Sequence, residues 1–389
     1  MKKTYAVLGA GRQGTAAAYD MARWGAASKV ILGDVDWTAA MRGAERVNHL
    51  LGQEIAQARL VDVTNPASVL SALAGVDAFL SAVPYYYNLD LTRIAIQART
   101  NMADLGGNTA IVRQQHLFDS VAREAGISII PDCGQVPGLG TVLCTYAMSL
   151  LDETVDIFMW DGGIPLHPRP PFQYLLTFHI AGLTNEYAEP AVFLRDWKIT
   201  EVEPMTELET IEFPEPIGRL EAFVAGGGTS TMPWTFEGKL RTLQNLTLRY
   251  PGHFSQLRAY WDLGLWSLEP VQVGQQEVVP REVFHALFEP KVQIPGDKDV
   301  CIIRIRAVGK KDGHPAEALV ELIDTFDDAS GFSAMERMTG WTAAIAVEMA
   351  AHNLTPRGAG GVESFIPPVP YVAELRKHGL NVTEKVTIT

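Results

Sequence analysis

The chain has 389 residues, of which 47% are hydrophobic and 20% charged, and this balance is typical of a soluble globular protein with room for two domains. A surplus of 45 Asp and Glu residues over 32 Lys and Arg residues gives a net charge of −13, which argues against nucleic acid or an anionic membrane as a partner. The three cysteines form no CxxC pair, and no stretch of about 20 residues is apolar enough to cross a bilayer, so we expect a cytoplasmic protein without a membrane span.

The first 135 residues alternate short apolar runs with segments of helical spacing, as in a parallel sheet that helices cover on both faces. The predicted strands are residues 4–9, 29–34, 58–62, 76–82, 101–104 and 127–131. The predicted helices between them are residues 13–24, 38–51, 66–73, 89–100 and 110–125. Six strands with five crossovers are typical of a doubly wound Rossmann sheet, an α/β fold whose ligand lies outside the carboxyl ends of the strands.

The first predicted strand runs into a glycine turn. Gly9 lets the chain turn sharply, Gly11 leaves room for a pyrophosphate to approach the backbone, and Gly14 lets the following helix lie close to the strand. The helix begins with Arg12 and Gln13, and its free N–H groups would face the phosphates. Because the turn lies between a strand and a helix, we interpret it as a dinucleotide-binding site rather than as a fortuitous glycine turn.

Asp34 ends the second predicted strand and bears on the choice of cofactor. A carboxylate there accepts hydrogen bonds from a ribose 2′-hydroxyl and repels a 2′-phosphate. Residues 35–37 supply no cation to reverse this repulsion. We therefore predict NAD as the cofactor, with one reservation, because Arg12 could hold a phosphate.

Three loops follow predicted strands at the ligand edge of the sheet, and each is a candidate wall of the nicotinamide pocket. The loop after the fourth strand contains Ala82, Val83 and Pro84, which we assign to the cofactor, and Tyr85, which we assign to the substrate. The other two loops are residues 104–107 and 131–138.

Two residues of these loops have side chains that could take part in catalysis. Asp104 could orient an amine or accept a proton, and it could equally be a turn residue that binds backbone N–H groups. Cys133 is predicted to line the pocket rather than to act as a nucleophile, since neither a base nor an acyl-type substrate is visible. Its neighbour Asp132 is interpreted as structural.

After a predicted helix at 138–151, the chain becomes rich in β-type segments with polar turns between them. The predicted strands are residues 154–160, 172–180, 219–225, 241–250, 300–308 and 317–325, with a hairpin turn at Asp312-Gly313. We expect an α+β substrate and dimerisation domain over 138–337, with a mostly antiparallel or mixed sheet. A last long helix, 339–353, is predicted to pack back on the first domain, 1–137, which the C-terminal segment of about 338–389 would complete.

Two segments of the second domain could bind a substrate. The hydroxyls of Thr229, Ser230 and Thr231 follow three glycines, a composition that suits a carboxylate, although the segment could also be a plain loop. Arg249 could clamp a carboxylate and His253 could be a general base, or they could be a surface ion pair and a helix cap. No His, Cys, Asp or Glu spacing is typical of a metal site, so we expect no metal.

Several of these segments together resemble the saccharopine dehydrogenase-like oxidoreductases, and most closely the lysine 6-dehydrogenases. The resemblance rests on motifs in the order Val7-Leu8-Gly9-Ala10-Gly11, Ser81-Ala82-Val83-Pro84-Tyr85, Asp104-Leu105-Gly106-Gly107, Pro131-Asp132-Cys133-Gly134, Gly227-Gly228-Thr229-Ser230-Thr231 and Thr247-Leu248-Arg249-Tyr250-Pro251-Gly252-His253. It implies an NAD-binding domain completed by the C-terminal segment, an inserted second domain, and a homodimer or larger homo-oligomer. It also favours the glycine–hydroxyl loop, Arg249 and His253 as site residues.

The activity that the resemblance implies is NAD-dependent oxidation of L-lysine at its ε-amine. In this hypothesis His253 or Asp104 accepts the amine proton, while the hydroxyl loop and Arg249 hold the α-carboxylate. Saccharopine reductases and carboxynorspermidine dehydrogenases share the cofactor motifs, so reduction of an imine formed from an amine and an oxo acid is an alternative. An NAD-sensing binding protein without turnover is the alternative outside enzymes.

Overall fold

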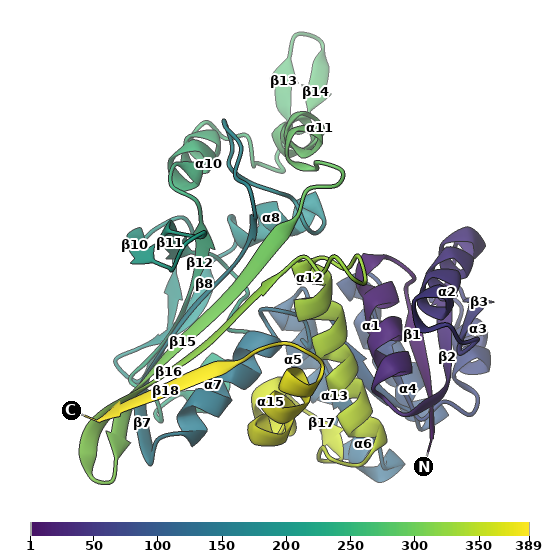
Figure 1. The fold of residues 1–389 in the computed structure, drawn as a ribbon. Coiled ribbons are helices and arrows are strands. Elements are labelled where there is room, and N and C mark those ends of the chain that lie inside the picture. Colours follow the sequence, from purple (N-terminus) through teal and green to yellow (C-terminus); the bar gives the residue numbers. More distant parts are fainter. Residues whose placement is uncertain (1, 389) are drawn as a thin grey trace.

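The computed structural model describes residues 2–388, which form two large sheets with helices against them (Figure 1). All strands of the first sheet are parallel, in the order β17-β6-β5-β4-β1-β2-β3, so β1 to β6 have the order of a dinucleotide-binding fold. This confirms the predicted Rossmann sheet. The strands are β1 (Lys3–Leu8), β2 (Ala27–Asp34), β3 (Ala56–Leu60), β4 (Ala78–Ser81), β5 (Asn101–Asp104), β6 (Ser128–Ile130) and β17 (Gly358–Ala359).

The helices of the first domain begin and end close to their predicted positions, with one exception. The predicted helix 110–125 is two helices, because the chain breaks at Leu117, whose side chain is exposed to solvent. Asp36 and Asn65 cap the helices that follow them by accepting backbone N–H groups. The helices are α1 (Arg12–Arg23), α2 (Trp37–Leu51), α3 (Pro66–Leu73), α4 (Asn88–Ala98), α5 (Thr109–His116) and α6 (Asp119–Ala125), with a 3-10 turn at Tyr85–Tyr87.

The second sheet has nine strands and is mixed, as predicted. The central strand β7 pairs in parallel with β12 and antiparallel with β15, and the remaining pairs are antiparallel. Helix α7 (Leu139–Ser149) packs against β7 and β15. The strands are β7 (Glu153–Pro165), β8 (Ala191–Arg195), β9 (Lys198–Val202), β10 (Glu209–Glu212), β11 (Arg219–Val224), β12 (Thr242–Arg249), β15 (Asp299–Lys311), β16 (His314–Thr325) and β18 (Thr383–Ile388).

The predicted strand at 172–180 was wrong. This segment has no regular secondary structure, and α8 (Ile180–Glu186) begins at its end. Its apolar side chains, such as Tyr174 and Leu176, enter an aromatic cluster with α8, α10 (His253–Asp262) and α11 (Pro280–Val292) instead of pairing in a sheet. The apolar content of the segment therefore reflects packing between helices, which a strand pattern does not distinguish.

A small lobe lies beyond the second sheet and includes α10 and α11 (Figure 1). The hairpin of β13 (Val271–Val273) and β14 (Gln276–Val278) projects from it. A further short helix, α9 (Met232–Phe236), lies within the segment that joins β11 to β12.

The last segment returns to the first domain and then to the second sheet. It contains α12 (Ala334–Glu336), a π-helical turn (Arg337–Trp341), α13 (Thr342–Ala351), α14 (Val362–Phe365) and α15 (Pro368–Lys377). Helix α13 packs against α1, β4 and β5, and a Cβ at Gly340 would lie 2.6 Å from a backbone oxygen of α1. Strand β17 then extends the first sheet and β18 the second. Among residues 2–388, no helix combines the length and apolar character that crossing a bilayer requires.

Candidate active site

The predicted glycine turn connects β1 to α1 at the carboxyl edge of the first sheet. Gly9 has a φ of +106°, a conformation that favours glycine, and a Cβ there would lie 2.5 Å from the carbonyl oxygen of Ala82. A Cβ at Gly14 would collide with the carbonyl oxygen of Gly9, whereas a Cβ at Gly11 would meet open space. The turn therefore holds the helix against the strand and leaves the backbone at Gly11 open to a pyrophosphate.

The Asp34 carboxylate is fixed against this turn. One of its oxygens accepts the backbone N–H of Ala10 at 2.7 Å, and the other accepts that of Asp36 at 2.9 Å. The carboxylate thus lies beside the turn, where the adenosine ribose of a dinucleotide lies in this fold. Neither residues 35–38 nor residues 61–65, which follow β2 and β3, include a cation.

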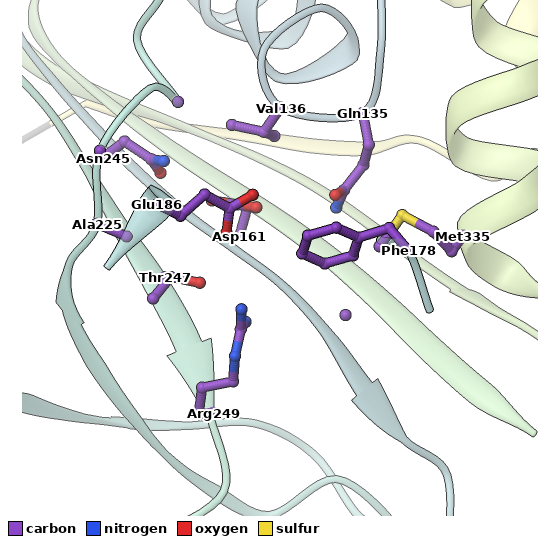
Figure 2. A pocket seen from close by; sticks show the side chains of 13 residues that line it. Gln135, Val136, Asp161, Phe178, Glu186, Ala225, Asn245, Thr247, Arg249 and Met335 are labelled. Carbon is purple, nitrogen blue, oxygen red and sulfur yellow. The ribbon is translucent and has the colours of Figure 1, made fainter. Parts of the chain in front are cut away.

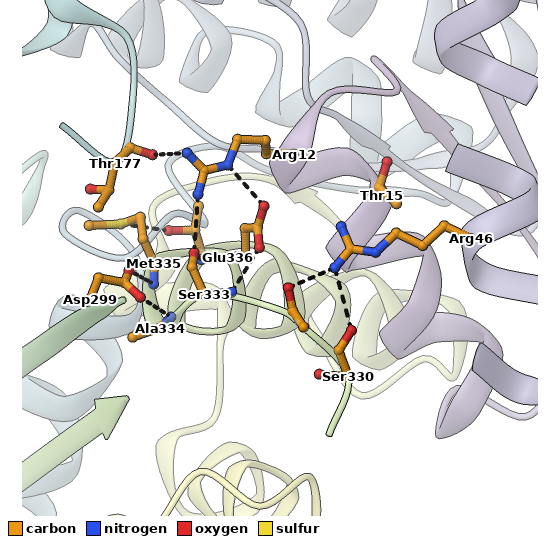
Figure 3. A network of polar contacts seen from close by, with 12 residues as sticks. Arg12, Thr15, Arg46, Thr177, Asp299, Ser330, Ser333, Ala334, Met335 and Glu336 are labelled. Carbon is orange, nitrogen blue, oxygen red and sulfur yellow. Dashed lines mark hydrogen bonds and ion pairs between the residues drawn. The ribbon is translucent and has the colours of Figure 1, made fainter. Parts of the chain in front are cut away.

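Arg12, the first residue of α1, reaches the segment around α12 (Figure 3). Its Nε donates to the Glu336 carboxylate at 2.9 Å, and its other nitrogens donate to the Thr177 carbonyl and the Ser333 hydroxyl at 3.4 Å each. The Asp299 carboxylate of β15 accepts two backbone N–H groups at the start of α12, at 2.8 and 2.9 Å. Arg12 therefore links the cofactor turn to the second domain.

A cleft of about 650 Å³ is lined by residues of both domains. One wall is formed by the loops after β4, β5 and β6, as the sequence predicted, and it includes Ala82, Val83, Pro84 and Tyr85. The other wall is formed by α8 and by the glycine loop at 226–227. The cleft lies outside the carboxyl ends of the parallel strands, where a nicotinamide would lie.

Asp132 presents a buried carboxylate to this cleft. Its backbone has a φ of +61°, and its carboxylate accepts a hydrogen bond from the Ser230 hydroxyl of the second domain. Burial is the main cause that raises the pKa of Asp132 to about 7, and the neighbouring Asp104 carboxylate raises it further. A carboxyl group with a pKa near neutrality can accept and return a proton at physiological pH.

A recess of about 40 Å³ adjoins the cleft and shares Val136, Glu186 and Gly226 with it. Its floor is the second sheet, as Figure 2 shows. Asn245, Thr247 and Arg249 alternate along β12, so their side chains lie on one face of the sheet. The neighbouring strand β7 places Asp161 directly beside Thr247.

Arg249 is the cation of this recess and is only 3% exposed. Its guanidinium lies over the rings of Tyr174 and Tyr187 and points toward Glu186 and Asp161 (Figure 2). Burial raises the pKa of Glu186 to about 8 and that of Asp161 to about 6, while the Arg249 charge opposes both shifts. A recess with one cation and two carboxyl groups matches a head group that has a carboxylate and an ammonium.

Three polar atoms of the recess have no hydrogen-bond partner among the described residues. They are Nε2 of Gln135, Oδ1 of Asn245 and Nε of Arg249, and all three are buried. Buried polar groups in proteins are nearly always hydrogen-bonded. Two donors and one acceptor therefore remain for a polar ligand.

His253 lines neither the cleft nor the recess and is only 1% exposed. It lies among aromatic rings, and its Nε2 is hydrogen-bonded to the Tyr187 hydroxyl at 3.2 Å. Burial, together with the charge of Arg249, lowers the pKa of His253 well below its ordinary value, so the imidazole is neutral. The structure thus places it behind Arg249, in position to orient Tyr187.

Asp104 and Cys133 also lie outside the lining of both pockets. The Asp104 carboxylate accepts the backbone N–H groups of Gly106 and Asp132 at 2.8 and 3.1 Å, and the side-chain amide of Gln115 at 2.8 Å. This is the turn role that the sequence offered as the alternative to catalysis. The Cys133 thiol faces a backbone carbonyl of β6 at 3.3 Å, and burial raises its pKa well above the ordinary value.

The three hydroxyls predicted to hold a carboxylate are bonded to protein groups. Thr229 donates to the Val192 carbonyl at 2.7 Å, Ser230 to Asp132, and Thr231 to the Glu363 carboxylate at 2.9 Å. The glycines of this loop, residues 226–228, line the pockets instead. The loop therefore contributes its backbone to the site.

Several lining residues were not among the sequence candidates. The sequence could have indicated Asn245 and Thr247, because polar residues alternate with leucines between 245 and 249. It could also have indicated Asp161, because this carboxylate directly follows the apolar residues 157–160 of the strand. No pattern in the sequence indicates Glu186, because residues 172–180, which lead into α8, were predicted to be a strand.

Both parts of the chain match models of one protein family. Residues 5–130 match the saccharopine dehydrogenase NADP binding domain, and residues 134–380 match the saccharopine dehydrogenase C-terminal domain. The mitochondrial alpha-aminoadipic semialdehyde synthase of Mus musculus is 24% identical over 67% of this chain and 27% of its own length. The saccharopine dehydrogenase [NADP(+), L-glutamate-forming] of Pyricularia oryzae is 24% identical over 57% of this chain and 50% of its own.

The matches cover between 23% and 53% of the length of these and similar curated relatives. Among solved structures, the apo saccharopine dehydrogenase (L-Glu forming) of Saccharomyces cerevisiae superimposes with a TM-score of 0.78 and 18% identity. That match covers 99% of this chain and 100% of the other. The two chains therefore share one fold over the matched residues.

Proposed function

The chain belongs to the saccharopine dehydrogenase family, and from this premise we propose that it catalyses nicotinamide-dependent oxidation at a C–N bond of an amino acid. The observation that carries the proposal is Arg249, a buried cation that faces two carboxyl groups in a recess beside the cofactor cleft. This recess accepts the head group of an amino acid and directs the rest of the molecule toward the cleft. Asp132, with a pKa near neutrality, lines that cleft.

The charges of the two pockets favour L-lysine as the substrate. Their described lining includes four carboxyl groups, those of Asp132, Asp161, Glu186 and Glu189, and one arginine. L-Lysine has one carboxylate and two amino groups, so it complements this lining. Saccharopine has three carboxylates, and the described lining offers them a single arginine, so two of them would lie among carboxyl groups without a cation. We therefore propose oxidation of L-lysine at its ε-amine.

The residues of the site then have separate roles. Arg249 holds the α-carboxylate, and Glu186 and Asp161 face the α-ammonium group. Ala82, Val83 and Pro84 would hold a nicotinamide in the cleft, and this group would supply the hydride acceptor for the carbon that bears the ε-amine. Asp132 in its ionised form accepts the proton that the ε-amine loses as the C=N bond forms. Water then adds to the imine and gives an aldehyde and ammonia, and the ammonia takes up the proton from Asp132 and leaves as ammonium.

We propose NAD as the cofactor, on the support of Asp34 and the absence of a cation in residues 35–38 and 61–65. We expect Asp34→Ala to weaken NAD binding by about 10-fold or more, because a charged hydrogen bond to the ribose is lost. NADP binding should be unchanged or tighter, because the repulsion of a 2′-phosphate is also lost. Fluorescence titration with both reduced nucleotides measures the two affinities.

Asp36→Ser is the matched control for this experiment. It removes a carboxylate two residues away, while serine can still cap α2 as Asp36 does by accepting the N–H of Thr38. This variant should keep the nucleotide preference of the wild type. An equal loss of NAD and NADP binding in Asp34→Ala would mean that Asp34 does not contact the ribose.

A substrate screen that follows nicotinamide absorbance tests the proposed activity. We expect steady formation of NADH with L-lysine and none with saccharopine. Turnover of saccharopine alone would assign the chain to the activity named for its curated relatives. Nucleotide binding without turnover of any amino acid, or of any amine and oxo acid pair in the reverse direction, would favour a sensing role.

A further inference from the structure

A second group of ionisable side chains is buried in the first domain. Asp20 of α1, Glu348 of α13 and His378, the residue after α15, each offer one ligand atom, and these atoms lie within 4.8 Å of one another. The three residues are 0%, 8% and 2% exposed. Positions so far apart in the sequence form no spacing motif, and none of them lines the cleft or the recess.

The histidine of this group is held in a defined orientation. Nδ1 of His378 lies 3.0 Å from a carboxylate oxygen of Asp20. The ring stacks on Trp24, with the ring centroids 4.5 Å apart and the planes inclined by 12°. An imidazole fixed in this way is oriented before any ligand binds.

The carboxylates of the group are not satisfied by the protein. Oδ1 of Asp20 and Oε1 of Glu348 are buried and have no hydrogen-bond partner among the described residues. Nε2 of His378 is also buried without a hydrogen bond, and the nearest carboxylate oxygen, that of Glu374, lies 3.6 Å from it. A Cβ at Gly25 would lie 2.6 Å from Oε1 of Glu348, so the glycine leaves the space that this carboxylate occupies. Buried carboxylates are normally paired with a cation or bound to a metal ion.

The neighbouring cationic side chains are engaged elsewhere. The Arg23 guanidinium lies over the Trp24 ring at 4.5 Å and donates to the Tyr19 hydroxyl. The Lys377 ammonium pairs with the Glu374 carboxylate at 2.8 Å. Among residues 2–388, no lysine or arginine therefore forms an ion pair with Asp20 or Glu348, and an ion from solution could take that place.

We propose that Asp20, Glu348 and His378 bind one divalent transition-metal ion, with Zn²⁺ and Mn²⁺ as the candidates. Two carboxylates and one imidazole are ligands that both ions accept. Asp20 lies on α1 about 12 Å along the helix from Arg12, which begins it beside the cofactor turn. The ion thus has a structural role, joining α1 and α13 to the C-terminal segment, and it takes no part in hydride transfer.

Metal content and thermal unfolding of the untagged full-length protein test this site. Protein stripped with EDTA should take up about one equivalent of Zn²⁺ or Mn²⁺ per chain. Its Tm should rise on the order of 5 °C, because the ion binds the folded state alone. Failure of the stripped protein to take up either ion, with an unchanged Tm, would overturn the proposal.

Three variants assign the ion to these ligands. Glu348→Gln and His378→Gln should each lower the affinity for the ion by at least about 10-fold, and Glu348→Gln keeps the shape of the side chain so that folding is retained. His352→Gln removes an exposed imidazole four residues from Glu348 and should bind the ion as the wild type does. Equal binding by wild type, Glu348→Gln and His378→Gln would place the ion elsewhere and refute the site. Nucleotide binding by each variant confirms that it is folded.

Discussion

Arg249→Met should lower kcat/KM for the amino-acid substrate by about 10³-fold or more, while nucleotide affinity stays within about two-fold of the wild type. The guanidinium is buried and faces Glu186 and Asp161, so its loss removes the partner of the substrate carboxylate and leaves two carboxyl groups without a cation. Steady-state kinetics and a nucleotide titration on the same preparation measure the two quantities.

Two further variants separate binding from folding. Arg249→Lys keeps the charge but not the planar fork, so kcat/KM should recover only in part. Arg219→Met removes an exposed arginine from β11 and should leave the kinetics unchanged. If Arg249→Met lost no more activity than Arg219→Met, the recess would not hold the substrate carboxylate.

Asp132→Asn should lower kcat by about 10²- to 10⁴-fold, which is the usual contribution of a general base, and should leave nucleotide binding intact. Asp132 accepts a proton only when it is ionised, and its pKa is raised to about 7. The rate of amine oxidation in the wild type should therefore rise with pH through about 7 and level off above it. The rise should be absent in Asp132→Asn. A pH profile of kcat/KM, which reports the ionisation of the free enzyme, measures it.

Ser230→Ala is the companion to this variant. The Ser230 hydroxyl donates to the Asp132 carboxylate and lowers its pKa, so its removal should shift the rise in rate to higher pH. The rate at the plateau should be retained, because the base itself is still present. Wild-type turnover and an unchanged pH profile in Asp132→Asn would assign the proton transfer to another group.

The nucleotide-binding part of the molecule could be predicted because the residues that define it are close together in the sequence or lie at the ends of adjacent strands. The roles of Gly9 and Gly14 follow from backbone geometry within one turn, and the position of Asp34 follows from the end of the adjacent strand. The loop from Ala82 to Tyr85 could be placed because parallel strands end at one edge. Each of these features depends on residues that are close in the sequence or lie at the ends of adjacent strands, so it can be predicted from a single sequence.

The candidate substrate site depends on contacts between residues that are far apart in the sequence, and such contacts cannot be read from the sequence. The hydroxyls of Thr229, Ser230 and Thr231 had the right chemistry for a carboxylate, but their partners are protein groups from distant segments. Asp132 was interpreted as structural. Its pKa is set mainly by burial, and this burial arises from the packing of both domains, which the sequence does not show. Glu186 could not be found, since a strand had been predicted just before α8.

In the proposed binding mode the recess holds the zwitterionic head of an amino acid while the reacting amine lies in the cofactor cleft. A comparison of NAD-linked oxidation of L-lysine with that of two analogues tests this binding mode. Cadaverine lacks the α-carboxylate, and 6-aminohexanoate lacks the α-amino group.

Wild-type kcat/KM should fall by about 10³-fold with cadaverine and by a smaller factor with 6-aminohexanoate, because only the carboxylate faces the buried Arg249 charge. In Arg249→Met, L-lysine and cadaverine should become equally poor substrates. Equal kcat/KM for L-lysine and cadaverine in the wild type would contradict this binding mode, because no group of the recess would then recognise the head of an amino acid.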